Sequence, residues 1–231
     1  MTVRQPVDVA RIGKPVKTLF GWLIFRRISR PLSIALAKAG ANPSAITAAG
    51  LASGLAGAVL FAGGTRGAMI GGAALAVLAK VLDASDGEVA RMRNVDTPNG
   101  YVADGLCDRL RDTALLLGCA GAARHAASAP AWSLGAVCAY LGFFYVSAAS
   151  PSHWREARDE RDVDEKHAFR ISRSLRLGAG DTLAVALCVA AVTGKPLWLL
   201  MTVTVGASAA AVFKTRNLFR SRPWEAHTVI R

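Results

Sequence analysis

The sequence predicts an all-α, polytopic integral membrane protein in which an N-terminal amphipathic interfacial helix precedes six transmembrane helices. Of the 231 residues, 52% are hydrophobic and only 19% are charged, and the hydrophobic residues are gathered into runs. The net charge is +12, and most of the basic residues lie between those runs. Apolar runs separated by positive charge are typical of multi-span membrane proteins. A nucleic-acid partner is not expected, because the runs divide the basic residues among loops and leave no single basic face.

Residues 14–40 are predicted to form a helix that lies in the membrane interface. Apolar residues recur at spacings of three and four from Val16 to Ala35, and the Arg26–Arg27 pair lies among them. A basic amphipathic helix of this kind binds the surface of a lipid bilayer through its apolar face. Residues 1–13 precede it as a polar cytoplasmic tail that lacks the apolar core of a signal peptide.

Uncharged runs predict the membrane-spanning helices. Residues 39–65, 126–152 and 196–213 carry no charge and are long enough, or nearly so, for a hydrocarbon core of about 30 Å. Three shorter runs extend through charge-bearing helical segments, which would place ionisable groups at the membrane face, where they usually mark a functional cavity. The predicted spans are residues 44–64, 67–92, 100–123, 130–150, 178–194 and 196–214, within a membrane domain of residues 41–214 that a cytoplasmic tail of residues 215–231 follows.

The distribution of lysine and arginine predicts the orientation of the spans. Eight basic residues precede the first span, seven lie between Arg155 and Arg176, and five lie from Lys214 onward. Only three, Arg66, Arg124 and Lys195, fall on the opposite face. Cytoplasmic loops carry an excess of basic residues, so both termini are expected in the cytoplasm of a multi-pass inner (cell) membrane protein.

Acidic residues concentrate where the second and third spans meet. Seven of the sixteen lie in residues 83–112. Asp83 and Asp86 stand three apart at the end of the second span, and Asp104 and Asp108 stand four apart at the start of the third. A turn-rich hexapeptide joins the two helices and predicts that they are antiparallel neighbours. Four carboxylates would then converge, and they cannot all remain ionised near a membrane unless cations neutralise them.

Several chemistries suit such a cluster. All-oxygen ligands favour a hard divalent ion, Mg²⁺ or Mn²⁺, and two such ions form a clamp for displacement at phosphorus. Gly87 and Gly100 leave room for a phosphate or sugar, while Arg91 and Lys80 offer positive charge. A cation or proton transporter, or a helix-end charge network in a non-enzymatic membrane scaffold, would also use clustered aspartates.

The spacing of these residues resembles a known signature. The stretch reads Asp83-x2-Asp86-Gly87-x2-Ala90-Arg91-x8-Gly100-x3-Asp104-x3-Asp108. It is similar, without a gap, to the motif of the CDP-alcohol phosphotransferase (CDP-alcohol phosphatidyltransferase) superfamily. The likeness covers roughly residues 15–219, and its specific part is this 26-residue motif.

The resemblance implies a membrane transferase that moves a substituted phosphate group from a CDP-linked donor to an acceptor hydroxyl and releases CMP, in phospholipid or polar phosphodiester biosynthesis. The donor would be CDP-diacylglycerol or another CDP-alcohol. Two Mg²⁺ or Mn²⁺ ions and a homodimer are implied as well. The implied metal ligands are Asp83, Asp86, Asp104 and Asp108, and Asp108 would also be the general base. The implied CDP-binding residues are Gly87, Ala90, Arg91, Gly100, Thr47 and Ser44.

Departures from the family pattern bear on the substrate. The first span is entered through Pro43-Ser44-Ala45-Ile46-Thr47, with serine where many relatives have asparagine, which weakens a nucleotide contact. Residues 150–155 lack the basic segment usual in relatives that use inositol phosphate, whereas residues 27–33 resemble a branch whose donor is a CDP-polyol. Three arginines spaced by three before the fifth span form either an anion pocket for a phosphorylated acceptor or an ordinary positive-inside anchor. The candidates for an acceptor or phosphate pocket are Lys80, Arg170, Arg173 and Arg176.

Overall fold

The computed structural model describes residues 7–12, 18–148, 168–170 and 176–220, and they are helical except for two short strands and the connecting turns. The elements are η1 (Val9–Ile12), η2 (Gly21–Phe25), α1 (Arg26–Ala39), α2 (Pro43–Ala62), α3 (Arg66–Met92), α4 (Pro98–Ala122), α5 (Ala129–Ala148), β1 (Ala168–Arg170), β2 (Arg176–Gly178), α7 (Ala179–Thr193) and α8 (Pro196–Arg220). The predicted all-helical architecture is therefore confirmed. One feature is added to it, an antiparallel pairing of β1 with β2.

Polar caps determine where the helices around the aspartates begin. The Asn42 side chain accepts a hydrogen bond from the Ser44 backbone N–H at 3.1 Å at the start of α2. The Thr97 hydroxyl accepts one from the Gly100 N–H at 3.1 Å at the start of α4, where Pro98 occupies the first turn. Such caps satisfy backbone donors that have no partner inside the helix, and proline suits the first turn because it has no N–H. The Thr97 cap thus fixes where α4 begins, and with it where Asp104 and Asp108 lie along this helix.

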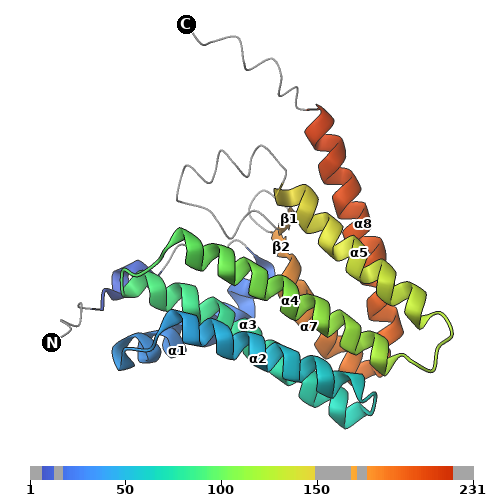
Figure 1. The fold of residues 1–231 in the computed structure, drawn as a ribbon, viewed down its shortest axis with the longest axis horizontal. Helices are drawn as coiled ribbons and strands as arrows, with labels where there is room; N and C mark the ends of the chain where they lie inside the picture. The colour runs from blue at the N-terminus through green and yellow to red at the C-terminus, as the bar shows by residue number, and fades with distance from the viewer. Residues whose placement is uncertain (1–6, 13–17, 149–167, 171–175, 221–231) are drawn as a thin grey trace, which may run out of the picture.

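Helix α2 is the central packing element beside the motif. It lies along both α3 and α4, which make few direct contacts with each other, and α7 packs on α3 (Figure 1). Small residues permit the close approach, since a Cβ at Gly72 of α3 would lie 2.6 Å from the Gly57 carbonyl oxygen of α2. The predicted neighbours α3 and α4 are therefore bridged by α2, and they do not pack directly along their length.

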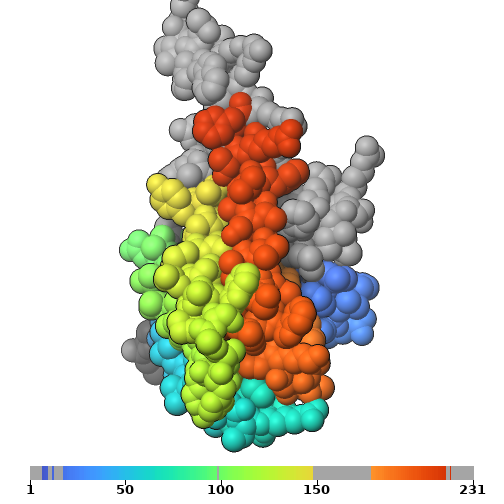
Figure 2. Space-filling view, turned by 90° about the vertical axis from the view of Figure 1, so that its right-hand side faces the viewer, coloured from blue at the N-terminus to red at the C-terminus, as the bar shows by residue number. Residues whose placement is uncertain are grey.

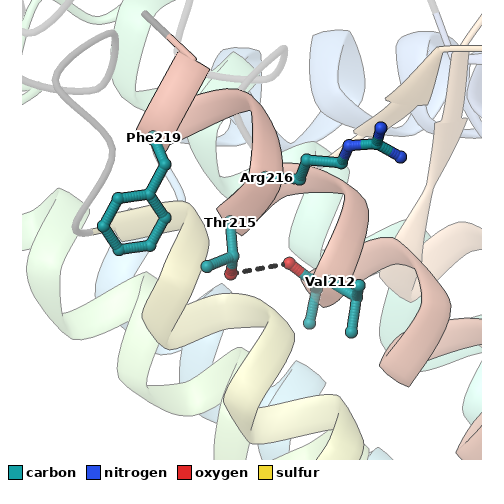
Figure 3. Close-up of a pocket in the computed structure, with 5 residues that line it drawn as sticks. Val212, Thr215, Arg216 and Phe219 are labelled. Carbon is teal, nitrogen blue, oxygen red and sulfur yellow. Dashed lines mark hydrogen bonds between the residues drawn. The ribbon is translucent and has the colours of Figure 1, made fainter. Parts of the chain in front are cut away.

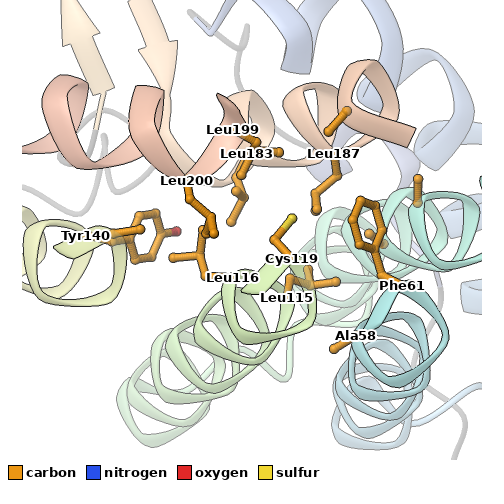
Figure 4. Close-up of a cluster of buried hydrophobic side chains, with 14 of the residues drawn as sticks. Ala58, Phe61, Leu115, Leu116, Cys119, Tyr140, Leu183, Leu187, Leu199 and Leu200 are labelled. Carbon is orange, nitrogen blue, oxygen red and sulfur yellow. The ribbon is translucent and has the colours of Figure 1, made fainter. Parts of the chain in front are cut away.

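The main hydrophobic core lies where α2, α4, α5, α7 and α8 meet. Each helix contributes a fully or almost fully buried side chain, namely Phe61, Leu116, Tyr140, Leu187 and Leu200, and Figure 4 shows them directed toward one another. Helices α5 and α8 pack along each other at the outer side of this core, as Figure 2 also shows. The core fixes α4 between α2 and α5, which determines which faces of α4 are buried.

Among the described residues, four helices are long and apolar enough to cross a membrane: α2, α3, α5 and α8. Their outer faces carry exposed apolar side chains, such as Val59 of α2 and Val212 of α8. The 15-residue helix α7 is apolar but shorter. These features support the membrane class, while the count of six spans stays a prediction.

The predicted interfacial segment is helical from residue 19 to Ala39, and it passes through a π-helical turn, η2, before α1. Residues 13–17 lie outside the described part of the chain. Gly40, with φ of 79°, ends α1 in the left-handed conformation that glycine adopts without strain. Trp22 and Ile28 are exposed on one side, and Ser29 and Ser33 are buried against the bundle on the other. The segment therefore has an exposed apolar surface, although its membrane contact stays a prediction.

Candidate active site

Three of the four motif aspartates come together between α3 and α4. One carboxylate oxygen each from Asp83, Asp104 and Asp108 can be chosen so that all lie within 4.8 Å of one another. Asp83 lies in the C-terminal part of α3, and the other two lie one turn apart on α4. Oxygen atoms this close repel one another when ionised, so the group is suited to hold a cation.

Asp86 lies beside this group, and its side chain is turned toward α2. It is 5% exposed, and its Oδ2 accepts a hydrogen bond from the Thr47 hydroxyl at 2.5 Å. The Thr47 hydroxyl also lies 3.1 Å from the Pro43 carbonyl oxygen of its own helix. Thr47 is thus placed next to a motif aspartate, which is a contact that the sequence did not predict. Ser44 is exposed in the first turn of α2.

Two cations neutralise part of the acidic charge. Lys80 Nζ lies 2.6 Å from Asp83 Oδ2, which is the i, i+3 pairing expected one turn apart on a helix. Arg111 contacts Asp83 at 3.3 Å and Asp108 at 2.5 Å. Sequence reasoning proposed Lys80 for a phosphate pocket and did not assign Arg111 to the cluster. The i, i+3 spacing of Asp108 and Arg111 was a signal in the sequence for a contact between these two side chains. The contact of Arg111 with Asp83 was not, because it depends on how α3 and α4 pack.

The aspartate oxygens that neither Lys80 nor Arg111 contacts are suited to bind a divalent metal ion. Asp104 Oδ1 is buried and, among the described residues, has no hydrogen-bond partner. A buried carboxylate oxygen without a partner is costly, and coordination of a hard cation such as Mg²⁺ or Mn²⁺ would satisfy it. The donor set of aspartate oxygens is therefore chemically appropriate for such an ion.

The predicted nucleotide-binding positions of the motif lie on the same two helices as the aspartates, after them on α3 and before them on α4. On α3, a Cβ at Gly87 would lie 3.2 Å from Arg91 Nη1, so the glycine leaves the space into which that guanidinium reaches. Arg91 Nε is buried without a hydrogen-bond partner among the described residues, and Ala90 is half-buried beside it. Gly100 is exposed in the first turn of α4. An anion bound near Arg91 would supply the missing acceptor.

The arginines predicted for an acceptor pocket are only partly placed. The backbone of Arg170 in β1 is paired with that of Arg176 in β2, whereas Arg173 lies outside the described residues. Helix α7 follows β2 directly, and a Cβ at Gly180 would lie 3.4 Å from Lys80 Nζ. The segment that carries Arg176 therefore leads into a helix end beside the aspartates.

A surface hollow elsewhere offers no comparable chemistry. It has a volume of about 390 Å³ and lies on α8, lined by Ala211, Val212, Thr215, Arg216 and Phe219 (Figure 3). The Thr215 hydroxyl is turned back onto the Ala211 carbonyl oxygen of its own helix at 2.9 Å. The hollow contains no carboxylate, so the aspartate cluster remains the candidate active site.

Comparison with known proteins points to one family. The family model described as CDP-alcohol phosphatidyltransferase matches residues 41–210. Over 95 residues, the chain is 37% identical to the phosphatidylinositol phosphate synthase of Mycobacterium marinum and 35% identical to that of Mycobacterium tuberculosis. The match covers 41% of this chain and 39% of the first relative, so it spans about two fifths of that protein.

Solved structures share the fold. The M. tuberculosis phosphatidylinositol phosphate synthase in complex with manganese and citrate has a TM-score of 0.63 at 23% identity, over 84% of this chain and 90% of that one. Its structure with CDP-DAG bound has a TM-score of 0.63 at 22% identity, over 88% and 100%. The family model spans most of the sequence and includes the whole aspartate motif. This chain therefore belongs to the CDP-alcohol phosphatidyltransferase family.

Proposed function

We propose that the protein is a divalent-metal-dependent CDP-alcohol phosphotransferase of phospholipid or polar phosphodiester biosynthesis. It would transfer a phosphatidyl or other substituted phosphate group from a CDP-linked donor to an acceptor hydroxyl and release CMP. The observation that carries the proposal is the convergence of Asp83, Asp104 and Asp108 in a member of this family, where one buried oxygen of Asp104 has no partner among the described residues. The transporter and scaffold alternatives give no role to the glycine and arginine positions of the motif.

The proposed cofactors are two Mg²⁺ or Mn²⁺ ions held by Asp83, Asp86, Asp104 and Asp108. Bound ions would neutralise the donor diphosphate and the charge that develops at phosphorus. Asp108 is the proposed general base. It would take the proton from the acceptor hydroxyl as that oxygen bonds to the phosphorus distal to cytidine, and the bond from this phosphorus to the CMP oxygen breaks. Manganese in a related synthase structure supports the choice of ion.

The proposed donor is CDP-diacylglycerol. The relatives that match are phosphatidylinositol phosphate synthases, and one of them has been solved with CDP-DAG bound. This favours a lipid donor over the CDP-polyol suggested by residues 27–33, while residues 150–155 lie outside the described part of the chain. The proposed CDP-binding residues are Gly87, Ala90, Arg91, Gly100, Thr47 and Ser44. The proposed acceptor-phosphate residues are Lys80, Arg170, Arg173 and Arg176.

Six membrane spans are proposed, with α4 and α7 joining the four helices that are both long and apolar enough to cross a membrane. Helix α4 presents Val102, Leu106 and Leu110 outward at intervals of four, while Arg111 and Asp112 are buried. A helix whose ionisable groups face the bundle and whose apolar side faces outward suits a bilayer. The proposal includes an inner-membrane homodimer with an interfacial α1 segment and a cytoplasmic active site.

Product analysis tests the proposed reaction. The purified full-length protein is incubated with CDP-diacylglycerol and, in parallel, with CDP-polyols, together with a panel of alcohols that includes inositol phosphate. We expect CMP and one new phosphodiester in mass spectra, and we expect both to vanish when EDTA removes the divalent ions. No CMP from any donor with Mg²⁺ and Mn²⁺ present would contradict the proposal. A product formed only from CDP-polyols would correct the donor.

A further inference from the structure

Arg111 is a buried cation that contacts three carboxylates at once. Its guanidinium lies 3.3 Å from Asp83 Oδ1, 2.5 Å from Asp108 Oδ1 and 3.1 Å from Asp112 Oδ1, and its side chain is 4% exposed. Asp83 belongs to α3 and the other two belong to α4. The donors of a guanidinium form a rigid planar fork, so several simultaneous contacts fix the orientation of each carboxylate. Arg111 thus links two helices that hardly contact each other directly.

Helix α5 holds Arg111 in place through Asp112. One Asp112 oxygen accepts from Arg111 Nε, and the other accepts from the Tyr140 hydroxyl. Asp112 and Tyr140 are both buried, and the Tyr140 ring packs edge-on against Phe144 with ring centres 4.8 Å apart. The series Tyr140–Asp112–Arg111 therefore connects the core to two of the motif aspartates.

Helix α2 leaves the space that the Arg111 stem occupies. A Cβ at Gly54 would lie 2.2 Å from Arg111 Cγ and 2.7 Å from its Cδ, which is far inside van der Waals contact. These atoms belong to the stem and not to the mobile end of the side chain, so alanine at position 54 must displace the arginine. At Gly50, one turn earlier on α2, the nearest atom would be 3.4 Å from a new Cβ, which is an ordinary contact. The Arg111 side chain therefore needs glycine at position 54 to keep its position, but it does not need glycine at position 50.

Arg111 has a different position from the other cation of the cluster. Lys80 contacts Asp83 Oδ2 while Arg111 contacts Asp83 Oδ1, so both oxygens of this carboxylate face a positive charge. Both cations lower the cost of gathering the acidic groups. Arg111 is in addition tied to Asp112 and through it to α5, so it can define where the carboxylates lie as well as neutralise them.

We propose that Arg111 is a positioning residue for the metal-binding carboxylates. Asp112 and Tyr140 fix its guanidinium, and the guanidinium holds Asp83 and Asp108 in the arrangement that accepts divalent ions. Gly54 provides the space that this arrangement requires. The inference rests on the proposed function, because it takes these aspartates to be metal ligands.

The test compares Gly54→Ala and Tyr140→Phe with Gly50→Ala as a matched control. Mn²⁺ binding to each purified full-length protein is followed by electron paramagnetic resonance without any nucleotide present. Hydrogen-bonding partners of metal ligands typically change metal affinity by about 10–100-fold, so we expect an increase of about 10-fold in half-saturating Mn²⁺ for the first two variants. Gly50→Ala should keep the wild-type value. In CMP-release assays the Mn²⁺ requirement should rise while the donor KM stays within about twofold.

A double-mutant cycle isolates the contact between Gly54 and Arg111. In an Arg111→Ala background the stem that Gly54→Ala displaces is absent, so adding Gly54→Ala should cause no further loss of Mn²⁺ binding. Thermal unfolding of each variant reports whether it is folded. Tyr140→Phe removes a single oxygen from an otherwise unchanged ring, so it keeps the proposal testable even if Gly54→Ala fails to fold.

The outcomes separate the two proposals. Wild-type Mn²⁺ affinity in the folded Gly54→Ala and Tyr140→Phe proteins would overturn the role of Arg111 and would leave the transfer reaction unaffected. A wild-type protein that neither binds Mn²⁺ nor releases CMP would overturn the proposed function and this inference with it.

Discussion

Two buried polar atoms of the motif have no hydrogen-bond partner among the described residues, and they belong to residues with different proposed ligands. Asp104 Oδ1 is proposed to meet a metal ion, and Arg91 Nε lies where a donor phosphate is proposed to bind. Burying a polar atom without a partner costs about 1–3 kcal/mol. Binding of the proposed ions and donor would give both atoms a partner.

Asp108→Asn tests the proposed general base. The amide keeps the shape of the carboxylate but cannot take a proton from the acceptor hydroxyl, so we expect CMP release to fall by about 10²–10⁴-fold, the usual contribution of a general base. The rate of CMP release with saturating donor and Mn²⁺ measures the effect. Asp96→Asn, in the exposed turn between α3 and α4, is the control and should keep the wild-type rate. Equal rates for both variants would exclude Asp108 as the base.

Individual residues were predictable from the sequence where the chemistry follows spacing along one helix. The i, i+4 spacing of Asp104 and Asp108 and the i, i+3 spacing of Lys80 and Asp83 were visible, and the structure brings these pairs close. The contact of Arg111 with Asp83 and the position of its side chain against α2 were not predictable. They depend on a missing side chain at Gly54 of another helix, and no local pattern reports this relation.

At the scale of elements, helix α1 is attached to the motif helix by a buried ion pair. Arg26 Nη1 lies 2.6 Å from Glu88 Oε1, and the Ser33 hydroxyl donates to Glu88 Oε2 at 2.6 Å. Glu88 is fully buried on α3, two residues after Asp86. The attachment therefore connects the proposed interfacial helix to the turn that carries two motif aspartates.

Arg26→Ala should destabilise the protein strongly. Loss of one partner from a buried ion pair leaves an uncompensated charge and costs about 3–5 kcal/mol. For a protein of this size each kcal/mol lowers Tm by about 2–4 °C, so we expect a drop of about 6 °C or more in thermal unfolding. Arg30→Ala, at an exposed position on the same helix, is the control. A Tm equal to that of the control would show that α1 is not held by this pair.

The contact between α2 and α4 depends on a glycine. A Cβ at Gly118 would lie 2.5 Å from the Ala58 carbonyl oxygen, a backbone atom that cannot move aside alone. Gly118→Ala should cost about 1–3 kcal/mol, as overpacking usually does. Gly142→Ala on α5, where a Cβ would have no neighbour within 4 Å, should not lower Tm. If the two variants unfold alike, the backbones of α2 and α4 are farther apart than the structure has them.

The starts of three helices were predicted closely from the uncharged runs and their charge-bearing extensions, and the structure shows a capping residue at each. Helices α2, α3 and α4 each begin within two residues of the predicted span. Their caps are, in order, Asn42 followed by Pro43, Thr65, and Thr97 followed by Pro98. The last helix was less predictable, since α8 continues past residue 214, the predicted end of its span, to Arg220. Charged side chains end a membrane span but not a helix. The strand pair β1–β2 was also missed, because three-residue strands carry too short a pattern.

For the whole molecule, the proposed orientation predicts which loops face the cytoplasm. Alkaline phosphatase, which is active only outside the cytoplasm, should be active when fused after residue 64, between α2 and α3. Fused after residue 96, between α3 and α4, it should be inactive, whereas a fluorescent protein fused there should fluoresce. The reason is the excess of basic residues on the side of the α3–α4 turn. Phosphatase activity at residue 96 would place the aspartates on the outer face.

The direction of the chain in α2, α4 and α7 has an electrostatic consequence for the site. Thr47 in the second turn of α2 contacts Asp86, Gly180 at the start of α7 adjoins Lys80, and α4 begins at Pro98, six residues before Asp104. The amino-terminal end of a helix carries about half a positive charge from its aligned peptide dipoles. Three such ends lie on the side of the bundle that carries the aspartates, where an anionic diphosphate is proposed to bind. Part of the attraction for that donor would then come from the backbone, and no single side-chain substitution could remove it.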